Sequence, residues 1–148
     1  MILKYITNVT NLDKVSSFQK LIFLMTNLIY FLPIFFYGIH KTTFLIMLIG
    51  FISLAYHSYQ CKCSTNPVCK YLLISDCIIG TFLAFLVLYR TTAHINYEIV
   101  SPLGILAFIF LLKGNNDRTK ETYIFLHSMW HLITGFILLY IAKIDSND

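Results

Sequence analysis

The chain has 148 residues, of which 57% are hydrophobic and only 12% are charged. Soluble domains average about 25% charged residues, so the composition excludes an ordinary soluble domain and indicates an all-α integral membrane protein with a single transmembrane domain over residues 1–148. The formal net charge of +4 is spread along the chain without a basic run, which argues against a nucleic-acid partner.

Five segments are apolar over a length that can cross a bilayer, which takes about 20 helical residues. Before them, residues 1–20 lack the clean apolar core of a cleavable signal peptide. We expect Pro33 to kink the first span, and the fourth span is the weakest because Glu98 and "SPLG" interrupt its first half. Short polar connections predict that consecutive helices pack as antiparallel neighbours in a helical bundle. The predicted spans are residues 18–37, 42–59, 69–89, 95–112 and 123–142.

Three of these spans carry ionisable side chains at depth, where such groups are costly and are functional candidates by default. His57 and, four residues earlier, Ser53 lie in the second span, Asp76 lies in the third, and His127 and His131 lie in "HSMWH" of the fifth. Residues four apart share one face of a helix. If the fourth segment crosses the membrane, all these groups lie in one leaflet. His57 is then near the end of its helix, and Asp76 and His127 are about 10 Å inside the starts of theirs, at 1.5 Å per residue.

Three histidines with one open position form a common catalytic zinc shell, with metal–nitrogen distances of about 2.0–2.1 Å. Such a zinc polarises carbonyl groups and lowers the pKa of bound water to about 7. Asp76 could then act as a general base or orient an imidazole, and Ser53 could donate a hydrogen bond to Asp76 or to the water. The alternative is that the histidines only form hydrogen bonds between helices, worth about 0.6 kcal/mol each. An isolated His-x3-His pair would favour that alternative, whereas three histidines and a carboxylate at one depth favour a metal.

Several motifs resemble the signature of the CREST superfamily of membrane proteins, which includes alkaline ceramidases and adiponectin receptors. They are "SLAYH", the aspartate of "YLLISD" and "HSMWH". The segments "TNLIYFLPIFFYGIHK", "YHSYQC" and "SPLGILAFIFLLK" are most similar to the branch that contains myomaker and a GPI-cleaving phospholipase. Members of the superfamily have seven helices. Here "TTAHINYE" and "GNNDRTKE" stand in place of the fourth and sixth, which implies a shortened version of that fold.

The resemblance implies a Zn²⁺ ion held by His57, His127 and His131 and assisted by Asp76 and Ser53. It implies a ceramidase- or phospholipase-like enzyme of the plasma membrane or an endomembrane that hydrolyses an amide or ester bond of a membrane lipid. The rival function is a non-catalytic membrane-remodelling or fusion protein of the myomaker type, in which zinc only ties helices together. Both functions need the same ligands. A cavity from the metal into the lipid would favour the enzyme, and a closed site would favour the structural role.

Three cysteines, Cys61, Cys63 and Cys69, cluster in "CKCSTNPVC", which we expect to be a loop. If this loop faces an oxidising compartment, we expect a disulfide from Cys61 or Cys63 to Cys69, with free thiols as the alternative. The resemblance implies a luminal or extracellular loop. The excess of lysine and arginine on its side of the membrane instead favours the cytoplasm. We expect the orientation of the superfamily.

Overall fold

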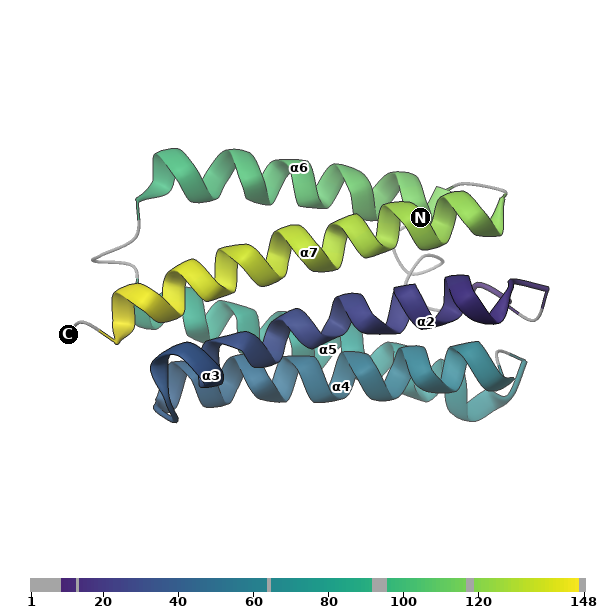
Figure 1. Ribbon diagram of the computed structural model, residues 1–148, viewed down its shortest axis with the longest axis horizontal. Coiled ribbons are helices and arrows are strands. Elements are labelled where there is room, and N and C mark those ends of the chain that lie inside the picture. The colour runs from purple at the N-terminus through teal and green to yellow at the C-terminus, as the bar shows by residue number, and fades with distance from the viewer. Residues whose placement is uncertain (1–8, 13, 64, 92–95, 117–118, 147–148) are drawn as a thin grey trace.

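The protein is an elongated all-α bundle, as predicted from its composition (Figure 1). The computed structural model describes residues 9–12, 14–63, 65–91, 96–116 and 119–146, and these residues form helices and connections without a strand. The helices are α2 (Ser17–Thr26), the 3₁₀ helix η1 (Asn27–Phe31), α3 (Leu32–Tyr37), α4 (Lys41–Cys63), α5 (Pro67–Thr91), α6 (Tyr97–Asn116) and α7 (Lys120–Asp145).

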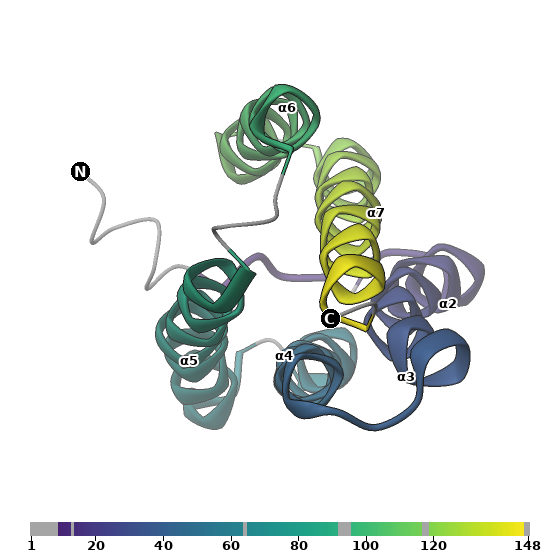
Figure 2. The same ribbon diagram turned by 90° about the vertical axis from the view of Figure 1, so that its left-hand side faces the viewer.

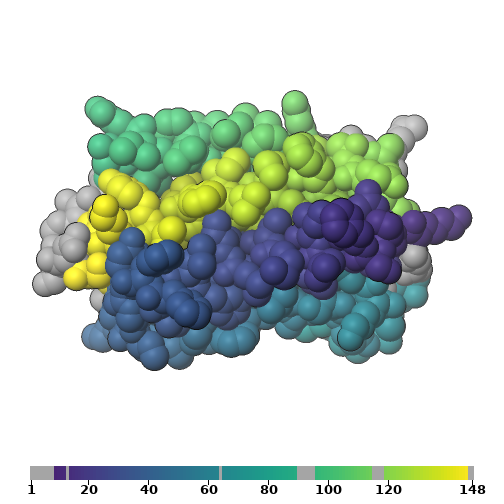
Figure 3. Space-filling model, in the orientation of Figure 1, coloured from purple at the N-terminus to yellow at the C-terminus, as the bar shows by residue number. Residues whose placement is uncertain are grey.

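Five helical stretches of the described chain are long and apolar enough to cross a membrane, and each overlaps one predicted span. By length and composition they make this a multi-pass membrane protein. The outward faces of the helices carry many large apolar side chains, such as Phe35, Phe85 and Tyr89, as helices that face lipid require. Figure 3 shows the same elongated bundle with its side chains in place. The stretches are Ser17–Tyr37, Lys41–Cys63, Pro67–Tyr89, Tyr97–Gly114 and Lys120–Asp145.

The first span is interrupted where Pro33 was expected to kink it. A proline lacks a backbone N–H, and its ring clashes with the carbonyl four residues earlier, here that of Ile29. The chain relieves this conflict by winding η1 before the proline, so that the Leu32 N–H donates to the Ile29 carbonyl three residues back. In a 3₁₀ helix, side chains three residues apart point the same way. Asn27 and Tyr30 are both buried, and η1 therefore sends two polar groups into the bundle.

The first span, α4 and α7 form the centre of the bundle, while α5 packs chiefly on α4 and α6 on α7 (Figure 2). Consistent with this arrangement, α5 and α6 are the least buried of the five spans. Two glycines let the central helices approach closely. A Cβ atom on Gly50 of α4 would lie 2.8 Å from the Tyr30 Cβ, and one on Gly135 of α7 would overlap the Ile29 side chain. η1 is thereby held between α4 and α7, with Tyr30 beside both.

Candidate metal centre

The three predicted histidine ligands come together between α4 and α7. One nitrogen from each of His57, His127 and His131 lies within 4.8 Å of the others, which is a group that could hold a metal ion. The side chains are buried, with exposed fractions of 0%, 8% and 2%. The two helices run side by side, and the His127/His131 pair presents both rings to α4 because residues four apart share a face. The shortest contact joins the Nε2 atoms of His57 and His131, at 3.0 Å.

The orientation of the His57 ring is set by Gln60, one turn further along α4. The Gln60 amide nitrogen donates to the Thr10 carbonyl at 3.0 Å and to the Tyr123 hydroxyl at 3.2 Å. The amide oxygen therefore faces His57, 2.9 Å from Nδ1. An amide oxygen only accepts hydrogen bonds, so Nδ1 must carry the proton. In the neutral ring, Nε2 then has a lone pair directed toward His131.

The His131 ring is set in the same way by Tyr30. Because the Thr134 hydroxyl donates to the Trp130 carbonyl at 2.8 Å, we infer that it accepts from the Tyr30 hydroxyl, 2.7 Å away. Since the Tyr30 hydroxyl donates its only proton to Thr134, its oxygen accepts from His131 Nδ1 at 3.1 Å. His131 Nε2 consequently carries a lone pair as well. This network assigns the tautomers of both rings from their partners.

Two lone pairs 3.0 Å apart repel each other unless a cation lies between them. A direct hydrogen bond would require one ring to carry a second proton. That ring would be a buried charge, and no described acidic side chain forms an ion pair with these histidines. A metal ion satisfies both nitrogens, since two ligands about 2.0–2.1 Å from a tetrahedral zinc are about 3.3 Å apart. His127 adds a buried Nδ1 without a hydrogen-bond partner among the described residues. The donor set therefore fits a metal.

Gln60 and Tyr30 are the kind of neighbours that metal-binding histidines have in proteins. Such histidines almost always donate the other ring N–H to an acceptor, which fixes the ring and raises its basicity. Both residues were missed by the sequence analysis. The sequence could have indicated Gln60, because it is an amide one turn from a histidine that lies in an apolar span. Nothing about the tyrosine in "LIYFLP" pointed to a role beside a metal.

Phe23 of α2 covers the histidines on one side. Its ring is fully buried, and its centroid lies 4.6 Å from that of His57, 5.7 Å from that of His127 and 6.2 Å from that of His131. Its ring therefore covers the three imidazoles on the side of α2.

Asp76 and Ser53 lie together, but Asp76 is not part of the histidine group. The Ser53 hydroxyl donates to the Asn27 oxygen at 2.9 Å and also interacts with the Asp76 side chain. Asn27 is itself oriented by donating to the Phe23 carbonyl at 3.2 Å. Asp76 is half-buried, and its carboxylate is not among the atoms that lie within 4.8 Å of one another. The catalytic role of Asp76 remains a prediction.

The cysteines correct one expectation. The segment "CKC" is not a loop, since α4 continues through Cys63, and Cys69 lies in the first turn of α5. All four cysteines of the chain are free in the structure, and the disulfide expected for an oxidising compartment remains a prediction. Cys61 is buried against Leu12 and Phe23, while Cys69 is buried in another cluster with Tyr56 and Leu73, and Cys63 is exposed.

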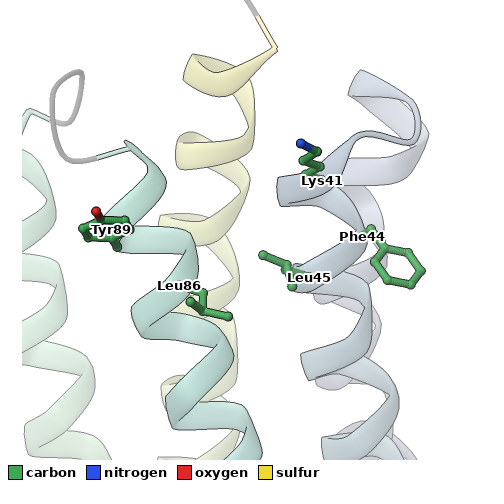
Figure 4. Close-up of a pocket in the computed structure, with 5 residues that line it drawn as sticks. All are labelled: Lys41, Phe44, Leu45, Leu86 and Tyr89. Atoms are coloured by element: carbon green, nitrogen blue, oxygen red, sulfur yellow. The ribbon is translucent and has the colours of Figure 1, made fainter.

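A pocket of about 440 Å³ lies between α4 and α5 at the opposite end of the bundle (Figure 4). Lys41, at its rim, is 16 residues before His57, or about 24 Å along the helix. The pocket is therefore separate from the histidines. Its lining residues are Lys41, Phe44, Leu45, Leu86 and Tyr89.

Comparison with known proteins assigns no family: no protein-family model, no curated protein and no solved structure matches the chain. The histidine cluster itself is thus the feature that bears on function.

Proposed function

We propose that the protein is a zinc-dependent hydrolase that cleaves an amide or ester bond of a membrane lipid. The observation that carries the proposal is the number of ligands. Catalytic zinc sites have three protein ligands and one open position, whereas structural sites usually have four protein ligands. Among the described His, Cys, Asp and Glu side chains, only three join the group. Imidazole suits zinc as a ligand, and the resemblance of "SLAYH" and "HSMWH" to the CREST superfamily points to zinc and to lipids.

The chain's own residues would divide the work as follows. The three histidines hold the metal, and Gln60 and Tyr30 keep two of the rings in the metal-binding tautomer. Zinc, when bound, supplies a Lewis acid for the scissile carbonyl. Asp76 takes a proton from the attacking water and returns it to the leaving amine or alcohol. Ser53 would position the Asp76 carboxylate by turning its hydroxyl proton from the Asn27 oxygen to Asp76.

Metal content and lipid products test the proposal together. Purified wild-type protein should carry about one zinc per chain and release fatty acid or lysolipid from mixed lipids, as measured by mass spectrometry. His131→Ala should lose both properties. Asp76→Asn should keep the zinc and lose about 10²–10⁴-fold in rate, which is typical for loss of a general base. His40→Ala is the matched control, because this histidine lies at the far end of α4 and pairs with Asp145.

The rival function is a non-catalytic membrane-remodelling or fusion protein in which zinc ties α4 to α7. The burial of all three rings beneath Phe23 favours it, since a lipid carbonyl has no access from that side. In this case His131→Ala should lose zinc and thermal stability while the wild type changes no lipid class. Binding free energy is folding free energy in a small bundle, so the loss of stability would be direct. Wild-type protein without bound metal would refute both functions.

A further inference from the structure

Residues 9–12 and 14–16, here called the N-terminal strap, cross the end of the bundle at which the histidines lie. Figure 2 shows the strap passing behind the helices from the side of α5 to the start of α2. Leu12 and Val15 are buried against Phe23 and Tyr123, with exposed fractions of 0% and 6%. Val9 packs on a second cluster, which includes Cys69. The strap is thus a docked part of the fold although it has no regular secondary structure.

A single side chain connects the strap to the candidate metal centre. The two ends of the buried Gln60 amide face opposite ways, with the oxygen accepting from His57 Nδ1 and the nitrogen donating to the Thr10 carbonyl of the strap. Gln60 therefore links His57 to the strap backbone through hydrogen bonds. Phe23 makes a second connection, because it touches the histidine rings and belongs to the same buried cluster as Leu12 and Val15.

The state of His57 decides which way the Gln60 amide points. A metal ion on Nε2 keeps the proton on Nδ1, and this proton holds the amide oxygen toward the ring. Without a metal, the ring can carry its proton on Nε2 instead. Nδ1 is then an acceptor that favours the amide nitrogen, and the turned amide would point its oxygen at the Thr10 carbonyl. Two facing oxygens repel each other, and the half-buried Thr10 carbonyl would lose its donor.

We propose that Gln60 is a positioning residue that couples the histidine cluster to the N-terminal strap, so that metal binding and docking of the strap stabilise each other. The inference rests on the metal binding proposed above, and it adds a second part of the fold whose docking responds to the metal. Coupling of this kind is reciprocal: if the metal favours the docked strap, docking raises metal affinity by the same factor.

Hydrogen–deuterium exchange of the full chain in detergent tests the coupling, with zinc content measured on the same samples. Zinc should slow exchange of the strap amides about 5-fold or more relative to chelated protein. Gln60→Glu should still bind zinc, because an oxygen still faces His57, but without the share of affinity that docking of the strap adds. It should abolish the effect of zinc on the strap, because a carboxylate has no donor for Thr10. Gln19→Glu is the matched control, since Gln19 caps the exposed start of α2 and glutamate serves there equally well.

The reciprocal arm starts from the strap. Leu12→Asn should undock it and lower zinc affinity about 5-fold or more, although Leu12 touches no histidine nitrogen. If the wild type binds zinc but its strap amides exchange at the same rate with and without zinc, the coupling is overturned and the metal site stands. Equal protection by zinc in wild type and Gln60→Glu would overturn the role of Gln60. Failure of the wild type to bind zinc would instead overturn the proposed function.

Discussion

Tyr30→Phe is the most informative single change at the metal centre, since it removes one oxygen and little else. The Tyr30 ring packs edge-on against His131, with centroids 5.9 Å apart, and phenylalanine keeps that contact. What is lost is the acceptor for His131 Nδ1, 3.1 Å away. Thr134 keeps its hydrogen bond to the Trp130 carbonyl, so the Thr134 hydroxyl is not left without an acceptor. The ring is then free to adopt the Nε2–H tautomer, which cannot bind a metal through Nε2.

The expected loss of zinc affinity follows from what hydrogen-bond partners do for metal-binding histidines. Removing the partner of a metal-binding histidine typically costs 10- to 100-fold in affinity, or about 1.4–2.8 kcal/mol. Competition against a chromophoric chelator of known zinc affinity measures the change, with thermal melting in detergent as a second measurement. Tyr71→Phe is the control, because this tyrosine of α5 is 70% exposed. A zinc affinity for Tyr30→Phe within 2-fold of the wild type would refute the tautomer argument.

Two further predictions concern packing and the thiols. Gly135→Ala should lower the free energy of unfolding by about 1–3 kcal/mol, because the new methyl overlaps the branched side chain of Ile29, which cannot swing aside. Gly104→Ala is the control, because a Cβ atom there meets nothing within 4 Å, and its melting temperature should be no lower than that of the wild type. Equal melting temperatures of the two variants would contradict the close packing at Gly135. Mass spectrometry after maleimide treatment without reductant should find all four thiols labelled in denaturant, but only the exposed Cys63 labelled rapidly in the folded protein. Fewer than four labels in denaturant would reveal a disulfide.

The spans and the shared face of the last two histidines were predictable from the sequence, because both depend on neighbours along the chain. Hydropathy over about 20 residues decides whether a helix can cross a bilayer, and the helical period places His127 and His131 on one side of α7. The end of α4 was less predictable. Polar residues after Tyr59 suggested a loop, but nothing there breaks a helix before Asn66, whose side-chain oxygen accepts from the Val68 N–H at the start of α5.

The tertiary structure alone decided how the histidines meet. Sequence spacing places a ring on a face of a helix, but the nitrogen that points inward depends on partners brought together by packing. Tyr30 reaches His131 across 101 positions of the chain, and Gln60 is oriented by Thr10, 50 positions away. Closeness in sequence likewise did not reveal that Cys61 and Cys69 pack into different clusters. Hydrogen bonds act only at contact distance, so their partners become known when the helices are assembled.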